Sequence, residues 1–284
     1  MTGGPGVVEG DSPRAADRAP LWLPLLRDLT GEVPAWTVLK NLDSAFAGIG
    51  DIDTMAPRAT WPTIEARFRA WAPAAGLSVV GVCRHNRRGP NFLARRVGDP
   101  YLFILDVKDT RPWRFSTLVT VEDALAAAAV DASGYRRTRA GFAGTLKLLF
   151  NGTGYGGYRR DAAIEQKHVL EDLRADPEGA LGAARLVGAA APALRRGIRA
   201  AMAGGWSRRD MLAVEVWCAA RGLVHPVRFG RQVLTRRTRD DRCPAFRLAY
   251  REGRRLPDDP AAWVASFEDA HPRGSLLGLR DKAA

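Results

Sequence analysis

Two aspartates, Asp51 and Asp53, stand two positions apart in the segment GDIDTM. This segment is predicted to form a short strand, in which residues two apart project from the same face, with Cα atoms about 6.6 Å apart. Ile52 would then point into the core, while Gly48 and Gly50 allow the backbone to turn close to a bulky ligand. The pair is suited to supply two carboxylate ligands to a metal ion.

A third carboxylate, Asp106, interrupts the apolar segment YLFILDVKD. A charge in such a strand has to be paired, to bind metal or to face a cleft. If this strand neighbours the strand of Asp53, three carboxylates converge, and two charges 4 Å apart repel by about 4 kcal/mol at an effective dielectric near 20. A divalent cation removes this repulsion. Ligation by oxygen alone favours Mg²⁺ or Mn²⁺ and argues against zinc.

Two such ions bridged by shared carboxylates would support in-line phosphoryl chemistry. One ion activates an acceptor hydroxyl, and the other holds a triphosphate and its leaving pyrophosphate. Lys40 and the amide of Asn41, at the end of the segment AWTVLKN, are suited to bind the β and γ phosphates. The alternative for Lys40 is a strand-end lysine in solvent.

Further basic residues are candidates for binding the nucleotide. Arg84 and His85 lie in a predicted turn between strands, where they either hold a phosphate or are solvated, and His85 is also a candidate general acid. Lys147, among apolar neighbours in TLKLLFNG, either snorkels to the surface or reaches the nucleotide. The glycine-rich NGTGYGG that follows has no G-K-[ST] and is not a Walker loop.

The segments around these residues predict a mixed sheet. A helix over LWLPLLRDL is followed by strands over AWTVLKNL and DIDTMA. A second helix is then predicted to start with Thr60 as its cap and Pro62 in its first turn. Next come strands over GLSVVGVCRH and PNFLARRV, joined across NRRG, and the strand YLFILDVKD. Trp36, Trp61 and Trp71 are expected in the core.

Beyond Pro112 the patterns predict helices, two of them with Thr120 and Ser207 as caps. The predicted helices are VEDALAAAAV, GFAGTLKLLFNG, AAIEQKHVLEDLR, GALGAARLVGAAA, RRDMLAVEVWCAARG and DDPAAWVASFEDA. We therefore expect a disordered tail over residues 1–20, an α/β domain over 21–115, a helical domain over 116–272 and a flexible tail over 273–284.

Composition limits the class of protein. The chain of 284 residues is 46% hydrophobic and carries a net charge of +12. Three scattered cysteines fit neither a disulfide framework nor a paired zinc site, and no apolar stretch reaches the roughly 18 residues that span a bilayer, so we expect a cytoplasmic protein without membrane contact. The arginines of residues 194–199 and 235–242 either form a polyanion track or are solvated.

Together these residues resemble the nucleotidyltransferase superfamily that includes DNA polymerase beta. The resemblance rests on a strand with a polar end (VLKN), a short loop, G-D-I-D opening onto a helix, and a third aspartate in a later apolar strand. It is greatest to a bacterial branch of nucleotidyltransferase-like proteins, some linked to polysaccharide biosynthesis. VLKN stands where the family has a Gly-Gly or Gly-Ser pair.

The resemblance implies an α+β fold in which a small mixed sheet, with helices on one face, precedes a helical domain. It implies Asp51 and Asp53 as metal ligands, Asp106 as third ligand and acceptor-activating carboxylate, and Lys40 with Asn41 as an altered phosphate site. The expected reaction is Mg²⁺-dependent transfer of a nucleoside monophosphate from an NTP, such as ATP, to a sugar phosphate, tRNA or protein, with no obligate partner. The alternative is a catalytically inactive protein of this fold that binds RNA or a protein partner.

Overall fold

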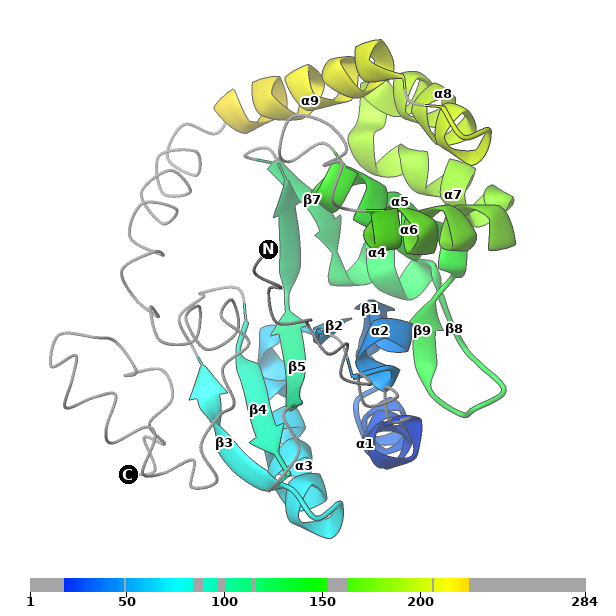
Figure 1. Ribbon diagram of the computed structural model, residues 1–284. Coiled ribbons are helices and arrows are strands. Elements are labelled where there is room, and N and C mark those ends of the chain that lie inside the picture. Colours follow the sequence, from blue (N-terminus) through cyan, green and yellow to red (C-terminus); the bar gives the residue numbers. More distant parts are fainter. Residues whose placement is uncertain are drawn as a thin grey trace, which may run out of the picture.

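Strands and helices are interspersed up to Thr138, and the described elements that follow are helical (Figure 1). The structure is a computed structural model that describes residues 18–48, 50–83, 89–96, 101–113, 116–152, 163–205 and 207–224. The predicted helix over residues 258–270 lies outside these ranges, as do both predicted tails apart from residues 18–20. The fold class is mixed α/β with a mixed sheet, as the sequence predicts.

Among the described residues, seven strands form one sheet in the order β3-β4-β5-β2-β1-β9-β8. The strands are β1 (Thr37–Lys40), β2 (Ile52–Met55), β3 (Ser78–Cys83), β4 (Asn91–Arg95), β5 (Leu102–Lys108), β8 (Ala128–Val130) and β9 (Arg136–Thr138). Pairing is antiparallel except for β2 with β5 and β1 with β9, which are parallel. A separate hairpin pairs β6 (Thr110–Trp113) with β7 (Ser116–Thr120).

Nine α-helices lie within the described residues. They are α1 (Ala19–Glu32), α2 (Leu42–Phe46), α3 (Trp61–Ala74), α4 (Val121–Ala126), α5 (Ala140–Lys147), α6 (Ala163–Ala175), α7 (Pro177–Ala183), α8 (Ala191–Met202) and α9 (Arg208–Leu223). Short 3-10 turns cover Arg58–Thr60 and Ala184–Ala190, and a π turn covers Leu148–Gly152. None of these helices is both long enough and apolar enough to cross a bilayer.

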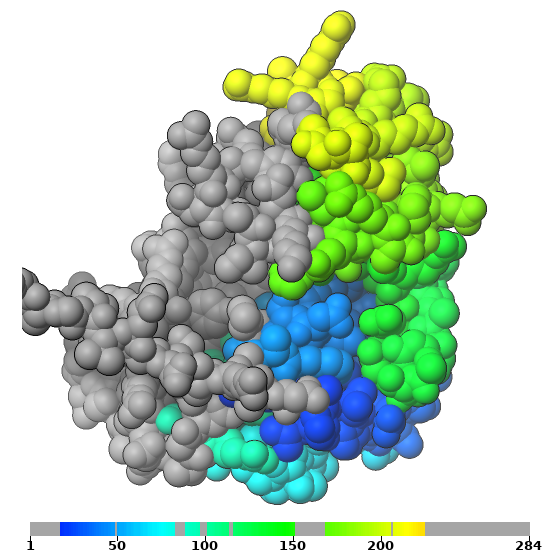
Figure 2. Space-filling view, turned by 45° about the vertical axis from the view of Figure 1, so that its right-hand side comes forward, coloured from blue at the N-terminus to red at the C-terminus, as the bar shows by residue number. Residues whose placement is uncertain are grey.

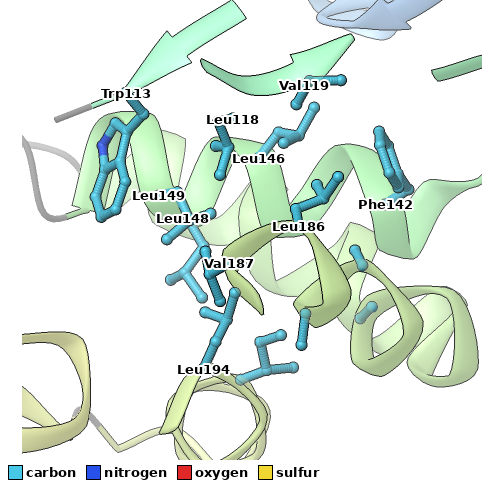
Figure 3. Packing of buried hydrophobic residues seen from close by; sticks show 14 of the residues in the cluster. Trp113, Leu118, Val119, Phe142, Leu146, Leu148, Leu149, Leu186, Val187 and Leu194 are labelled. Atoms are coloured by element: carbon cyan, nitrogen blue, oxygen red, sulfur yellow. The ribbon is translucent and has the colours of Figure 1, made fainter. Parts of the chain in front are cut away.

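Helices pack against both faces of the sheet. On one face, an apolar cluster joins α1 and α3 to strand residues such as Val38 and Ile52. A second cluster joins Leu39 and Met55 of the central strands to the hairpin and the later helices, and Figure 3 shows Leu118 and Leu186 within it. The expectation of helices on one face alone is therefore too simple, because β1 and β2 are covered on both sides. In the space-filling view α2 reaches the surface between α1 and the later helices (Figure 2).

Trp36 and Trp71 lie in the core, as predicted, while Trp61 is only partly buried at its edge. Trp71 stacks on Trp22 with ring centroids 5.2 Å apart, and Phe103 lies 5.3 Å from Trp22. This aromatic group joins α1, α3 and β5. Its burial fixes α1 and α3 beneath the sheet.

One expectation about the later segments is wrong. The helix predicted over residues 121–130 ends at Ala126, and Ala128–Val130 instead forms β8. Strand β8 pairs with β9 through a turn in which the Asp131 side chain accepts a hydrogen bond from the Ser133 N–H and Gly134 has a φ of 83°. Cross-strand pairing thus overrides the helix propensity of alanine. As a result, two strands of the sheet come from beyond residue 115.

The hairpin β6–β7 and helix α8 were not predicted. Pro112 lies in β6 beside a register shift, where its missing N–H is tolerated. In α8, Leu194, Ile198 and Ala201 are buried at helical spacing, whereas Arg196 pairs with Asp210 of α9 at 2.7 Å. The arginines of residues 194–199 therefore belong to a packed amphipathic helix. Residues 235–242 lie outside the described ranges.

The predicted helix starts are mostly correct. Thr120 and Asp123 form a reciprocal capping box, and the Ser207 hydroxyl accepts a hydrogen bond from the Asp210 N–H. Thr60 does not cap α3, because its hydroxyl donates to the Pro57 carbonyl at 2.8 Å within a 3-10 turn.

Gly141→Ala is expected to destabilise the protein by about 1–3 kcal/mol or more. A Cβ atom at Gly141 would overlap the Asp176 carbonyl oxygen and the Ala180 nitrogen, which are backbone atoms that cannot move aside without parting α5 from α7. Guanidinium denaturation measures the loss. The matched control is Gly182→Ala, where a Cβ would meet nothing within 4 Å. That variant should gain up to about 0.5–1 kcal/mol, and equal stability of the two variants would contradict the close packing.

Candidate metal centre

The three predicted carboxylates come together. Strands β2 and β5 pair in parallel with Asp53 opposite Asp106, as the sequence-based geometry requires. Asp51 lies just before β2, and one ligand atom each from Asp51, Asp53 and Asp106 lies within 4.8 Å of the others. Asp53 is 3% exposed and Asp106 is 6% exposed. This group could hold a metal ion, and its donors are all carboxylate oxygens, which hard divalent cations such as Mg²⁺ and Mn²⁺ prefer.

The loop before Asp51 is shaped by glycine. Gly48 and Gly50 both have positive φ, 75° and 81°, a region that residues with a Cβ rarely adopt. The carbonyl of Gly50 accepts a hydrogen bond of 3.0 Å from the Tyr101 hydroxyl, which ties the loop to the start of β5. The role predicted for these glycines, turning the backbone beside the site, agrees with this geometry.

A β-bulge at the end of β1 places Lys40 at the site. Val38 pairs with Thr54, but the next pair is Lys40 with Asp53, so Leu39 is an extra residue. In a regular antiparallel ladder Leu39 would oppose Asp53, and Lys40 would point to the other face. With the bulge, Lys40 Nζ lies 2.5 Å from Asp53 Oδ2.

Asn41 completes this end of β1. Its backbone is left-handed, with a φ of 68°, which asparagine tolerates better than most residues. The side-chain amide donates a 2.8 Å hydrogen bond to the same Asp53 Oδ2 atom that Lys40 contacts. Lys40 and Asn41 therefore lie at the carboxylates, where both are partners of Asp53.

Lys40 is not a solvated strand-end lysine, because its side chain is only 10% exposed. Burial, and then the nearby Arg111 cation, lower the pKa of Lys40 to about 7, against the opposing effects of Asp51 and Asp106. Burial likewise raises the pKa of Asp106 above its usual value, against the opposing effect of Lys108. The site therefore holds its ionisable groups in a strongly desolvated environment.

Two basic residues at the site were missed by the sequence analysis. Lys108 Nζ contacts Asp106 Oδ1 and donates a 3.0 Å hydrogen bond to Asn91 Oδ1 on β4. Arg111 contacts Asp53 Oδ1 and lies 3.3 Å from Asp106 Oδ2. Lys108 could have been found, because a residue two positions from Asp106 in a strand shares its face. Arg111 could not, since β6 was not predicted.

Lys147 is buried at the end of α5, where it pairs with Asp172 of α6 at 2.7 Å. It does not snorkel to the surface. Its charge lowers the pKa of Lys40, so the two lysines lie within electrostatic range of each other. Burial raises the pKa of Asp172, against the effect of Lys147. Arg84 and His85 lie outside the described residues.

Comparison with known proteins does not assign this chain to a family. No protein-family model, no curated protein and no solved structure matches it. Any function has therefore to be inferred from the residues of the site itself.

Proposed function

We propose that the protein is a metal-dependent nucleotidyltransferase that transfers a nucleoside monophosphate from an NTP to an acceptor hydroxyl or phosphate. The observation that carries the proposal is the placement of Asp53 and Asp106 side by side on paired strands, with Asp51 within 4.8 Å. Mg²⁺ or Mn²⁺ is the cation suited to such oxygen donors. The resemblance of the segment from Trp36 to Asp109 to the DNA polymerase beta superfamily supports the same reading.

In the proposed reaction an acceptor oxygen attacks the α-phosphorus of the NTP. The bond between that phosphorus and the bridging oxygen to the β-phosphorus breaks, and pyrophosphate leaves with the electron pair. Bound divalent cations would neutralise phosphate charge and help to deprotonate the acceptor. Asp51 and Asp53 would act as ligands, while Asp106 would be the third ligand and would activate the acceptor by taking the proton that its hydroxyl loses.

The basic residues around the carboxylates supply the phosphate contacts in this proposal. When a cation binds the Asp53 carboxylate, Lys40 and Asn41 would release that carboxylate and bind the β and γ phosphates instead. Lys147 would contribute from α5, on the side of the later helices. In the same proposal, the sheet forms a nucleotidyltransferase core and the later helices form a helical domain that follows it. Sugar phosphates, tRNA and protein side chains are the candidate acceptors.

A thermal shift assay tests nucleotide binding. Mg²⁺ with ATP, CTP, GTP or UTP, each in turn, is expected to raise the Tm, because a ligand at 100 times its Kd stabilises by about 2.7 kcal/mol. Asp53→Asn should abolish the rise. Asp28→Asn, which alters a half-buried aspartate on α1 that pairs with Arg67, should keep it. If no NTP shifts the wild-type Tm in the presence of Mg²⁺, the proposal fails.

Transfer itself is tested by incubating the protein and a cell extract with NTP labelled at the α-phosphate or at the γ-phosphate. Nucleotidyl transfer moves only the α label to the acceptor, which is then isolated and identified. Transfer of the γ label alone would instead indicate a kinase.

The alternative function, a catalytically inactive protein that binds RNA or a protein partner, is favoured by one observation. Lys40, Lys108 and Arg111 all contact the carboxylates, so the three aspartates can coexist without a metal. Under this alternative, RNA would raise the Tm of wild type and Asp53→Asn equally, while no NTP would raise it.

A further inference from the structure

Arg111 bridges the two paired aspartates. Its guanidinium contacts Asp53 Oδ1 on β2 and lies 3.3 Å from Asp106 Oδ2 on β5. These oxygens belong to the carboxylates that could hold a metal ion. The guanidinium and a divalent cation would therefore compete for the same two carboxylates.

The three basic side chains at the site differ in how easily they can move away from the carboxylates. Lys108 is only 6% exposed and is fixed to Asn91 on the neighbouring strand. Lys40 is held opposite Asp53 by the β-bulge at Leu39 and is 10% exposed. Arg111 is 18% exposed and lies on β6. This strand pairs only with β7, in a hairpin that is separate from the central sheet. Of the three, Arg111 can move away with the least disturbance of the sheet.

A guanidinium displaced from two carboxylates needs a new anionic partner. Its planar fork of N–H donors matches a phosphate as well as it matches a carboxylate, and it stays charged at every physiological pH. A triphosphate whose metal ions sit on Asp53 and Asp106 would bring phosphate oxygens next to Arg111. The exchange keeps every charge paired in a site that is largely closed to water.

The geometry points to Arg111 as a triphosphate-binding residue that exchanges the carboxylates of Asp53 and Asp106 for phosphate when a divalent cation and an NTP bind together. This inference rests on the proposed function, because it assumes that an NTP binds at this site. Arg111 would then have two opposite effects. It would weaken the binding of a divalent cation alone, and it would strengthen the binding of a cation together with an NTP.

Arg111→Gln separates these effects in binding measurements on the full-length chain. Mn²⁺ alone, titrated by calorimetry, should bind about tenfold more tightly than to wild type, because a competing cation is gone. The NTP that shifts the wild-type Tm, titrated with Mg²⁺, should bind roughly 10- to 100-fold more weakly, because a charged phosphate contact is lost. A merely structural role for Arg111 would weaken both.

Arg111→Lys is the second variant and guards against misfolding of Arg111→Gln. Lysine keeps the positive charge but lacks the planar pair of N–H donors of a guanidinium. The affinity for Mn²⁺ should therefore stay near the wild-type value, while the affinity for the NTP falls. The matched control is Arg137→Gln, which removes an arginine that pairs with Asp131 on β8–β9. That variant should leave both affinities unchanged.

The outcomes separate this inference from the proposed function. If wild type binds Mg²⁺ and NTP but Arg111→Gln and Arg111→Lys bind the nucleotide normally, the inference is wrong and the proposed function stands. Weaker Mn²⁺ binding by Arg111→Gln, with a native circular dichroism spectrum, also overturns it. If wild type binds no NTP, both fail together.

Discussion

Asp106→Asn is expected to lower the rate of nucleotidyl transfer by about 10³-fold or more, because one substitution removes a metal ligand and the proposed acceptor-activating base. The α-labelled NTP reaction, run under single-turnover conditions, measures the loss. The variant should also bind Mn²⁺ more weakly. The Asn side chain keeps the size of Asp106 but leaves the buried Lys108 without its carboxylate, so some loss of stability is expected, and the rate is compared at a temperature where circular dichroism shows the variant to be folded.

The matched control for this variant is Asp109→Asn, three residues further along the chain. Asp109 follows β5 and pairs with the exposed Arg58 at 2.5 Å instead of facing the cluster. It should transfer nucleotide at the wild-type rate. If Asp106→Asn retained more than about a tenth of the wild-type rate while folded, Asp106 could not hold either role.

Trp22→Ala is expected to reduce the free energy of unfolding by about 3–5 kcal/mol. Trp22 is 0% exposed, stacks on Trp71 at an interplanar angle of 13° and contacts Phe103. Its removal opens a cavity between α1, α3 and β5 that rigid neighbours cannot fill. Guanidinium denaturation, followed by tryptophan fluorescence and circular dichroism, gives the change in midpoint.

Two further variants calibrate this loss. Trp61→Ala removes a tryptophan that is only partly buried at the edge of the same cluster, and it should cost distinctly less. Trp22→Phe should also cost less than Trp22→Ala, because the Trp22 Nε1 atom has no hydrogen-bond partner among the described residues, so its loss leaves nothing unpaired. Equal losses for Trp22→Ala and Trp61→Ala would contradict the packing.

Much of the central sheet could be predicted from the sequence. Short segments rich in apolar residues located β2 and β5, and the charge inside YLFILDV identified Asp106 as a residue that would meet Asp53 if the two strands were neighbours, as they are. Those inferences succeed because a buried charge in an apolar strand has few acceptable environments. The strand pairing then brings the carboxylates together with no further assumption.

The surroundings of the aspartates could not be predicted in the same way. The bulge at Leu39 depends on where β1 pairs with β2, and no local pattern signals it. The contacts of Arg111 depend on the hairpin β6–β7, which forms where the sequence predicts a domain boundary. Strand β8 is an alanine run whose helical propensity is overridden by a partner strand. In each case the deciding interaction is between segments distant in sequence.

Strand β2 has only four residues, and its two faces meet different surroundings. Asp53 and Met55 face one side, while Ile52 and Thr54 face the other. Losing or gaining one residue there would exchange the two sides, driving a carboxylate into hydrocarbon and an isoleucine into the site. The length of β2 is therefore as constrained as the identity of Asp53, because the register of this short strand decides which side chains reach the carboxylate cluster.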